Sequence, residues 1–144
     1  MKQYLMLKMG FLSHWHHRVT AEKFRQAEID RSQPWILDYL AEHDGCIQRE
    51  LADQAHFDPA SITSALVRME EHGMVRRESV PGDRRALRVY LTDKGRMKQA
   101  YVQRVFAEEE ARALRGFTEA EKAQLDAFLQ RIHDNLDQED EEAK

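Results

Sequence analysis

One stretch of the chain, residues 58–91, constrains the fold more than any other, because it encodes a helix followed directly by a hairpin. Asp58 is a suitable helix cap, since its carboxylate can accept hydrogen bonds from the free amides of the first turn. Pro59 follows at the first helical position, where its missing N–H costs nothing. The apolar side chains then recur at intervals of four and three residues and make one narrow stripe: Ile62, Leu66 and Met69. Gly73 is predicted to end this helix.

Two short runs typical of strands follow the helix, residues 75–80 and 86–91. In the second run Leu87, Val89 and Leu91 alternate with the residues between them, as expected for a strand with one buried face. Turn-forming residues separate the two runs: Pro81, Gly82 and Asp83. The tip of the predicted hairpin therefore displays one carboxylate and two guanidinium groups: Asp83, Arg84 and Arg85.

The other faces of the predicted helix carry small or polar side chains: Ser61, Thr63, Ser64 and Arg68. A short polar helix beside a basic ribbon suits duplex DNA, because the major groove, about 12 Å wide, accepts a helix and the narrower minor groove attracts arginine. The pattern therefore favours a winged helix that binds DNA. The alternative is an ordinary helix and hairpin in an α+β domain, with the arginines only keeping the turn soluble.

The distribution of charge supports the DNA interpretation better than its sum does. The formal net charge of the 144 residues is −4, which by itself disfavours a nucleic-acid partner. The last eleven residues carry −5, however, so residues 1–133 carry +1. Residues 74–96 contain seven Lys or Arg against three Asp or Glu, a local +4. The basic surface is thus predicted on the hairpin, and the acidic tail, residues 138–144, is interpreted as a solvated helix end.

Length and motif content bound the class of protein. A chain of 144 residues fits one domain with helical extensions and can bury a core without a metal or a disulfide. The single Cys46 excludes a disulfide framework. We expect a soluble, cytoplasmic protein, because no window approaches the roughly 20 apolar residues of a membrane span and no signal-peptide cleavage site follows the start. We expect neither an enzyme nor a cofactor, since no Gly-rich phosphate loop, nucleophile elbow or metal-ligand spacing is present.

Helices are also predicted on both sides of the central stretch. Residues 4–29 carry more apolar side chains than one helix face needs, and Leu7 and Phe11 lie off the main stripe. Further helices are predicted at residues 93–114, after the cap Thr92, and beyond the capping-box pair Thr118 and Glu121. These terminal helices have the character of a helical dimerisation layer, so we expect a homodimer. Packing of the same helices on their own domain is the alternative.

The segment before the central helix completes a helix-turn-helix. Ser32 is predicted to cap a helix that ends at Gly45, and Ile47 to Ala55 mark a third helix close to the fourth. Cys46 is interpreted as a small buried hydrophobe rather than a redox switch. Three histidines in the first helix are compatible either with a metal site or with a solvated cluster: His14, His16 and His17.

The run from Gln48 to Gly95 contains RELADQ, a helix that ends in RMEEHGMV, the hairpin tip GDRR and the closing VYLTDKG. In the order and spacing of these motifs it resembles the MarR family of bacterial transcription regulators. The resemblance implies a mainly α fold with a small β-hairpin wing in one domain, residues 1–144. Residues 30–92 would form the winged-helix lobe, and residues 1–29 and 93–137 the helical dimerisation region.

The resemblance also implies roles for individual residues. The helix at residues 59–73 is the expected recognition helix, and Arg85 is expected to enter the minor groove, held by Asp83. The expected DNA-contacting residues are Gln48, Pro59, Ala60, Ser61, Thr63, Ser64, Arg68, Asp83, Arg84 and Arg85. The expected function is a ligand-responsive repressor that binds a pseudo-palindromic operator on double-stranded DNA as a homodimer. A winged-helix module that binds proteins rather than DNA is the alternative.

A small anionic or aromatic effector is the remaining expectation. The peroxide sensors of the family carry a reactive cysteine in the first helix, and this chain has none there. A crevice between the dimerisation layer and the DNA-binding lobe is expected to be lined by Trp15, Arg18, Trp35, Asp38, Tyr39 and Tyr101. Ordinary core packing is the alternative for these side chains.

Overall fold

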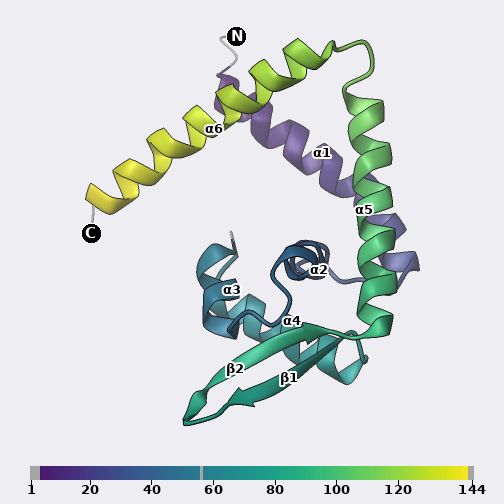
Figure 1. Cartoon of the computed structure of the whole chain (residues 1–144). Helices are drawn as coiled ribbons and strands as arrows, with labels where there is room; N and C mark the ends of the chain where they lie inside the picture. Colours follow the sequence, from purple (N-terminus) through teal and green to yellow (C-terminus); the bar gives the residue numbers. More distant parts are fainter. Residues whose placement is uncertain (1–3, 56, 143–144) are drawn as a thin grey trace. The chain divides into compact units, whose positions relative to one another are not determined.

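The computed structural model describes residues 4–55 and 57–142, with side chains as far as residue 138. Its elements follow the chain in this order: α1 (Leu5–Gln26), α2 (Gln33–Glu42), α3 (Gln48–Gln54), α4 (Pro59–Glu71), β1 (Val75–Val80), β2 (Asp83–Leu91), α5 (Asp93–Ala113) and α6 (Glu119–Glu142) (Figure 1). The predicted fold class, mainly helical with a small hairpin wing, is confirmed. The predicted acidic tail begins inside α6, and its residues 143–144 lie outside the described part.

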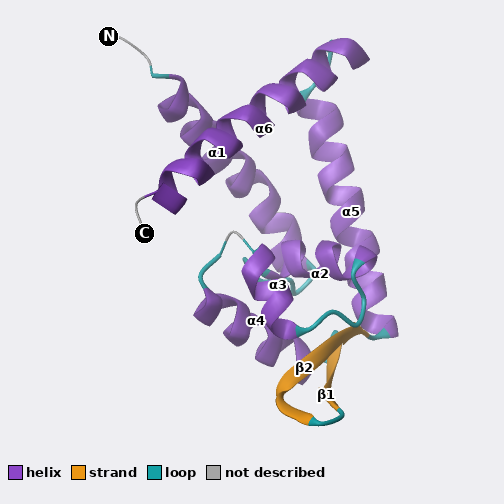
Figure 2. Ribbon diagram, turned by 60° about the vertical axis from the view of Figure 1, so that its left-hand side comes forward, coloured by secondary structure: helices purple, strands orange, loops and turns teal. Residues whose placement is uncertain are grey.

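The chain forms two compact units, Met1–Ala107 and Glu108–Lys144, and the boundary between them in the sequence falls within α5. The first unit holds the winged helix-turn-helix, with the hairpin at the opposite end of the unit from the start of α1 (Figures 1 and 2). The second unit contains the end of α5 and the whole of α6. None of the described helices is long and apolar enough to cross a membrane.

The core of the first unit lies among α2, α3, α4, the hairpin and α5. The predicted stripe of α4, Ile62, Leu66 and Met69, is fully buried there, which confirms the helical period assigned to it. Burying each such side chain stabilises the fold by about 1.5–3 kcal/mol. The other fully buried large apolar side chains are Ile36, Leu37, Leu40, Leu51, Met74, Val75, Val89 and Val102.

The hairpin is antiparallel, with Val75 opposite Leu91 at its base and an irregular register after Ser79. Strand β2 begins at Asp83, three residues before the start predicted from the sequence, so the tip is tighter than expected. A third segment also joins β2: Ile47 forms an isolated bridge with Arg88. The amide of Val89 donates to the Cys46 carbonyl at 3.0 Å, and these bonds attach the helix-turn-helix to the wing.

Three predicted helix starts have the expected hydrogen bonds. The amide of Ser61 donates to Asp58 Oδ1 at 2.9 Å, which confirms Asp58 as the cap of α4. The hydroxyl of Thr92 accepts from the amide of Gly95 at 3.0 Å at the start of α5. The capping box of α6 is reciprocal as well, with bonds of 2.8 and 3.1 Å between Thr118 and Glu121.

The prediction that Ser32 caps α2 through its side chain is wrong. Ser32 stands immediately before α2, but its backbone is helical, with φ −90° and ψ −13°, and its side chain makes no capping bond. The side chain of the next residue, Gln33, instead turns back and accepts from the amide of Asp30 at 2.9 Å. The turn that enters α2 is therefore closed by an amide oxygen rather than by a hydroxyl.

The C-terminal half of α1 packs on α5 within the first unit. Phe24 meets Phe106 edge to face, with ring centroids 5.5 Å apart. The hydroxyl of Tyr101 donates to the Lys23 carbonyl at 3.1 Å, and the ammonium of Lys98 donates to the carbonyl that ends α1 at Ala27. The end of α1, and with it the linker to α2, is thus fixed against α5.

Candidate nucleic-acid interface

The exposed face of α4 carries the side chains that the sequence assigned to DNA contact. Ala60, Ser61, Thr63 and Ser64 are all exposed, whereas the opposite face is buried. The hydroxyl of Ser61 is bonded to the Asp58 carboxylate, and that of Thr63 donates to the Pro59 carbonyl at 3.0 Å. A hollow of about 640 Å³ lies over the first half of the helix and is lined by Arg31, Ser32, Phe57, Asp58, Ala60, Ser61, Ser64 and Arg68.

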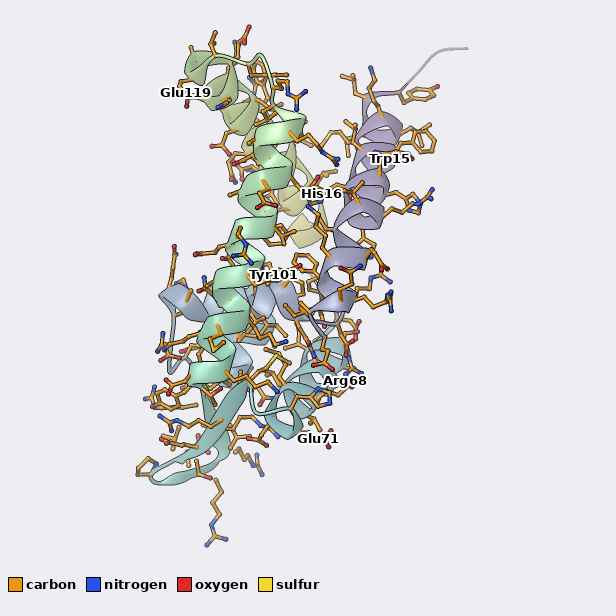
Figure 3. All side chains as sticks on the ribbon, turned by 90° about the vertical axis from the view of Figure 1, so that its right-hand side faces the viewer. Trp15, His16, Arg68, Glu71, Tyr101 and Glu119 are labelled. Carbon is orange, nitrogen blue, oxygen red and sulfur yellow. The ribbon has the colours of Figure 1, made fainter. Side chains whose placement is uncertain are left out.

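Arg68 projects from the same helix (Figure 3). Its Nε lies 3.4 Å from Asp30 Oδ2. Both side chains are about half exposed, at 48% and 58%. Solvent weakens such a pair, so the guanidinium is held loosely over the hollow rather than fixed within the protein. An exposed guanidinium beside small hydroxyl groups can meet either a phosphate or a guanine edge.

The hairpin tip presents Arg84 and Arg85 to solvent. The carboxylate of Asp83 accepts from the backbone amide of Arg85 at 2.9 Å. Asp83 thus holds Arg85 through its backbone amide, which fixes the backbone of the tip and leaves the guanidinium free of the carboxylate. Entry of Arg85 into the minor groove stays a prediction. Within the described residues neither guanidinium has a hydrogen-bond or ion-pair partner.

The other basic side chains of residues 74–96 each have a partner within the protein, although those of Arg76 and Arg96 stay more than half exposed. Their partners are Glu78 and the Tyr90 ring for Arg76, Glu70 and Gln48 for Arg77, the Gly45 carbonyl for Arg88, the His72 carbonyl for Lys94 and Asp44 for Arg96. The sequence predicted a local positive charge, and the basic side chains in it that have no partner among the described residues lie at the tip of the hairpin.

Gln48, which the sequence assigned to DNA contact, stands at the first position of α3. Its Oε1 accepts from Arg77 Nη1 at 3.2 Å, so its acceptor is already engaged within the protein. Arg77 was not among the predicted site residues. Sequence spacing gives no sign of it, because the two residues lie 29 positions apart.

The six predicted effector residues do not line one cavity in the described structure. Trp15 and Arg18 lie together, with the guanidinium 5.5 Å from the indole centroid, and line a shallow hollow with Val19. Figure 3 shows Trp15 on the side of α1 that faces away from α5. Asp38 is exposed, and Tyr39 stacks on Trp35 with centroids 5.1 Å apart. Tyr101 uses its hydroxyl to hold α1. Effector contact by any of these residues stays a prediction.

A cavity of about 480 Å³ does exist in the first unit, and of the six predicted residues only Trp35 lines it. Aromatic side chains form much of its wall: His16, His17, Phe24, Trp35, Phe57 and Phe106. Its charged residues are Arg25, Glu28, Asp30 and Arg31, all from the end of α1 and the linker to α2. Residue spacing carries no signal for this set, because the wall combines helices that are distant in the chain.

Two other candidate sites receive little support from the geometry. His14 and His17 line a small hollow with Ser13, Arg31 and Phe57, but among the described residues no group of three or more His, Cys, Asp or Glu is placed to hold a metal ion. Cys46 is half-buried, and burial raises the pKa of its thiol, which disfavours the reactive thiolate.

Comparisons with known proteins agree on one family. The MarR family model matches residues 28–86. The HTH-type transcriptional regulator YybA of Bacillus subtilis is 23% identical over 97% of this chain and 93% of its own length. The HTH-type transcriptional repressor IacR of Pseudomonas putida is 30% identical over 88% of this chain and 78% of its own.

Solved structures show the same fold. A crystal structure of the transcriptional regulator SlyA has a TM-score of 0.89, 25% identity and coverage of 99% of this chain and 100% of the other. A MarR family regulator from Listeria monocytogenes, crystallised with 26mer DNA, has a TM-score of 0.85, 24% identity and coverage of 94% and 90%.

Proposed function

Because the chain belongs to the MarR family of transcriptional regulators, we propose that it binds an operator on duplex DNA as a homodimer, through α4 and the tip of the hairpin. Regulation of transcription by a MarR-type winged helix is the function of the family, and the operator, the dimer and the effector are the proposed part. The likeness to the Listeria regulator bound to 26mer DNA supports a fold able to engage a duplex.

The observation that carries the proposal is the partition of basic side chains on the hairpin. Arg84 and Arg85 have no partner in the described structure, while the other five basic side chains of residues 74–96 each have one. A free guanidinium gains by binding phosphates, because each contact releases condensed counterions from the duplex. The tip is narrow, which suits the minor groove, where arginine is favoured by the negative potential.

The recognition helix supplies the second contact. A helix with small exposed side chains allows close approach to base edges in the major groove, and Ser64 and Arg68 are the groups on α4 that can reach them. Arg68 is proposed to read a base, since a guanidinium can donate two hydrogen bonds to a guanine edge. Ser61 is proposed to accept from a base amino group, because its hydroxyl already donates to Asp58 and only its acceptor lone pair is left.

The dimer proposal rests on apolar side chains that one chain leaves in solvent. In α1 these are Leu5, Met6, Leu7, Phe11, Leu12 and Trp15, and in α6 they are Phe128, Leu129 and Leu136. Large exposed apolar surfaces of this kind mark protein interfaces. We assign residues 1–29 and 93–137 to the dimerisation region, because two linked recognition helices are needed for half-sites about one helical turn apart.

Repression and an effector complete the proposal. IacR is named a repressor. We therefore assign this protein a repressing role in the cytoplasm, in which it blocks transcription while it is bound to DNA. The cavity of about 480 Å³ is the proposed effector site. Its aromatic wall and the nearby Arg31 favour an aromatic acid, and a ligand there must bind the DNA-incompetent state more tightly, since equal affinity shifts nothing.

The effector site can be tested by filling the cavity. Ala21 lines it, so Ala21→Leu is expected to weaken the release of DNA by aromatic acids such as salicylate, without a comparable loss of DNA affinity. Arg18→Ala is the matched control, because Arg18 lies outside the cavity. Equal release from the wild type and Ala21→Leu, or a change only in Arg18→Ala, would reject the cavity as the site.

The DNA proposal is tested by selecting bound duplexes from a random pool and measuring the affinity of the selected duplex at several salt concentrations, with sedimentation of the free protein. A dimer whose affinity falls steeply with salt is expected. Failure to retain any duplex would favour the alternative, a winged-helix module that binds a protein. A monomer with undiminished affinity would reject the dimer while leaving DNA binding intact.

A further inference from the structure

Arg77 lies on β1 with its side chain only 17% exposed, unlike the arginines of the hairpin tip. Its guanidinium donates from Nη1 to Gln48 Oε1 at 3.2 Å and from Nη2 to Glu70 Oε1 at 3.0 Å. Its backbone amide donates to the other oxygen of Glu70, Oε2, at 3.1 Å. One residue therefore occupies both oxygens of one carboxylate and the oxygen of one amide.

The three partners belong to three elements of the DNA-binding lobe. Gln48 is the first residue of α3, Glu70 lies in the last turn of α4, and Arg77 is in the middle of β1. The Arg77 guanidinium holds the pKa of the Glu70 carboxyl below its usual range, so this carboxylate is charged at neutral pH. The Gln48–Arg77–Glu70 clamp, as we name these three side chains, thus fixes the recognition helix against both the preceding helix and the wing.

We propose that Arg77 is a positioning residue for operator recognition, which acts through the Gln48–Arg77–Glu70 clamp by fixing the angle between α4 and the hairpin. The inference rests on the proposed DNA-binding function. If α4 lies in the major groove while the tip of the wing lies in the minor groove, the two must keep one relative geometry for both contacts to form together. A planar guanidinium suits this role because its donors have fixed directions, whereas a lysine ammonium offers one point charge on a flexible stem.

The hydrogen bonds of Arg77 and Gln48 disfavour direct DNA contact by either side chain. The Nη atoms of Arg77 are used within the lobe, and its Nε is buried without a partner among the described residues, where a phosphate cannot reach it. The side-chain oxygen of Gln48 already accepts a hydrogen bond from Arg77. Gln48 is therefore assigned to the clamp, in place of the DNA contact that the family resemblance implied.

The test compares Arg77→Lys with Arg76→Lys in the full-length protein, on the duplex selected by the wild type and on a random duplex of equal length. Arg77→Lys keeps the positive charge but loses the planar guanidinium that donates to both Gln48 and Glu70. Arg76→Lys is the matched control, because Arg76 is the neighbouring residue of the same strand, is exposed and, among the described residues, binds Glu78 and the Tyr90 ring alone. Thermal unfolding of each variant shows that the proteins compared are folded.

If Arg77→Lys lowers the population with the competent geometry to about a tenth, the apparent Kd for the selected duplex rises about tenfold. The random duplex, held mainly through phosphates, is expected to change less than about threefold, with the salt slope unaltered. Arg76→Lys is expected to change neither duplex by more than about twofold. Equal losses on both duplexes with a flatter salt slope would show that Arg77 contacts phosphate, and no loss on either would reject the clamp.

A second variant separates positioning from contact for Gln48. Gln48→Met is expected to weaken binding of the selected duplex in the wild type and to have no further effect in an Arg77→Lys background, because the two side chains act as one unit. An undiminished loss in that background would return Gln48 to direct DNA contact. Wild-type protein that retains no duplex at all would refute the proposed function rather than the clamp.

Discussion

Replacing Arg85 by alanine isolates the contribution of the hairpin tip. The guanidinium of Arg85 is exposed and has no partner among the described residues, so its removal breaks no interaction of the free protein. The carboxylate of Asp83 still accepts from the backbone amide at position 85, which keeps the turn in place. Any change in DNA binding therefore comes from the lost contact rather than from a damaged fold.

The expected size follows from counterion release. A dimer with about eight phosphate contacts has a slope of log K against log salt near −7, and the loss of one contact per subunit flattens it by about 1.8. Between 50 and 200 mM salt the wild type is then expected to lose about 20,000-fold in affinity and the variant about 2,000-fold. At low salt, where phosphate contacts contribute most, the variant binds both selected and random duplexes more weakly.

The measurement is a titration of fluorescent duplex at four or more salt concentrations, with Arg76→Ala as the control. Arg76 belongs to the same hairpin, but Glu78 and the Tyr90 ring already hold its guanidinium, so the control slope is expected to equal that of the wild type. An Arg85→Ala slope equal to the wild-type slope would contradict the placement of the wing on the duplex. Equal flattening by both variants would mean that charge anywhere on the hairpin suffices.

Three further predictions concern stability and assembly, and a fourth concerns base preference. Gly95→Ala is expected to destabilise the protein by about 3 kcal/mol or more in denaturant unfolding, because the added Cβ would lie 2.0 Å from the Met74 carbonyl oxygen; a loss below 1 kcal/mol would contradict that packing. Bonds from Ser61 lower the pKa of Asp58, so its stabilising effect is present at neutral pH and is lost as pH falls below about 4. The unfolding temperature of Asp58→Ala should therefore approach that of the wild type in acid, and a constant difference would refute the cap. Removing the chain after Gly116 should abolish tight binding to a palindrome, with sedimentation showing a monomer. Arg68→Ala should change base preference by about 1–3 kcal/mol in a competition assay, whereas equal losses on every sequence would limit Arg68 to the backbone.

The sequence predicted the recognition helix and the hairpin because their signals are local. The Asp58 cap, the apolar stripe and the turn at Gly82 each depend on residues within a few positions of one another, and all three occur in the structure. Gly73 ends the helix as predicted, with a positive φ of 71°. The role of Gly95 was hidden, because its lack of a side chain matters only where α5 passes the carbonyl of Met74.

Features that depend on distant parts of the chain were missed. The segment before α3 pairs with β2 across more than 40 positions, as in the bond from Arg88 to the Gly45 carbonyl. The predicted effector residues do not line one cavity for a related reason. Helical spacing places Trp15 and Trp35 on helices, but it does not show which side of each helix faces the other. Packing decides that direction, and it places His16 toward Phe106 while Trp15 points away.

The arginines of the DNA-binding lobe differ in how tightly the protein itself holds them, and this difference assigns their roles. The Arg77 side chain is 17% exposed and binds two other side chains. If its guanidinium bound DNA instead, the Glu70 carboxylate would lose its ion-pair partner. The Arg85 guanidinium has no partner among the described residues, so binding DNA breaks no interaction of the free protein. Arg68 is intermediate, because its half-exposed pair with Asp30, at 3.4 Å, is of a kind that contributes about 0–1 kcal/mol, whereas a paired guanine edge contributes about 1–3 kcal/mol. The exchange of Asp30 for a base is therefore favourable only where a suitable base is present, and it is this margin, rather than the net charge of −4, that can make binding depend on sequence.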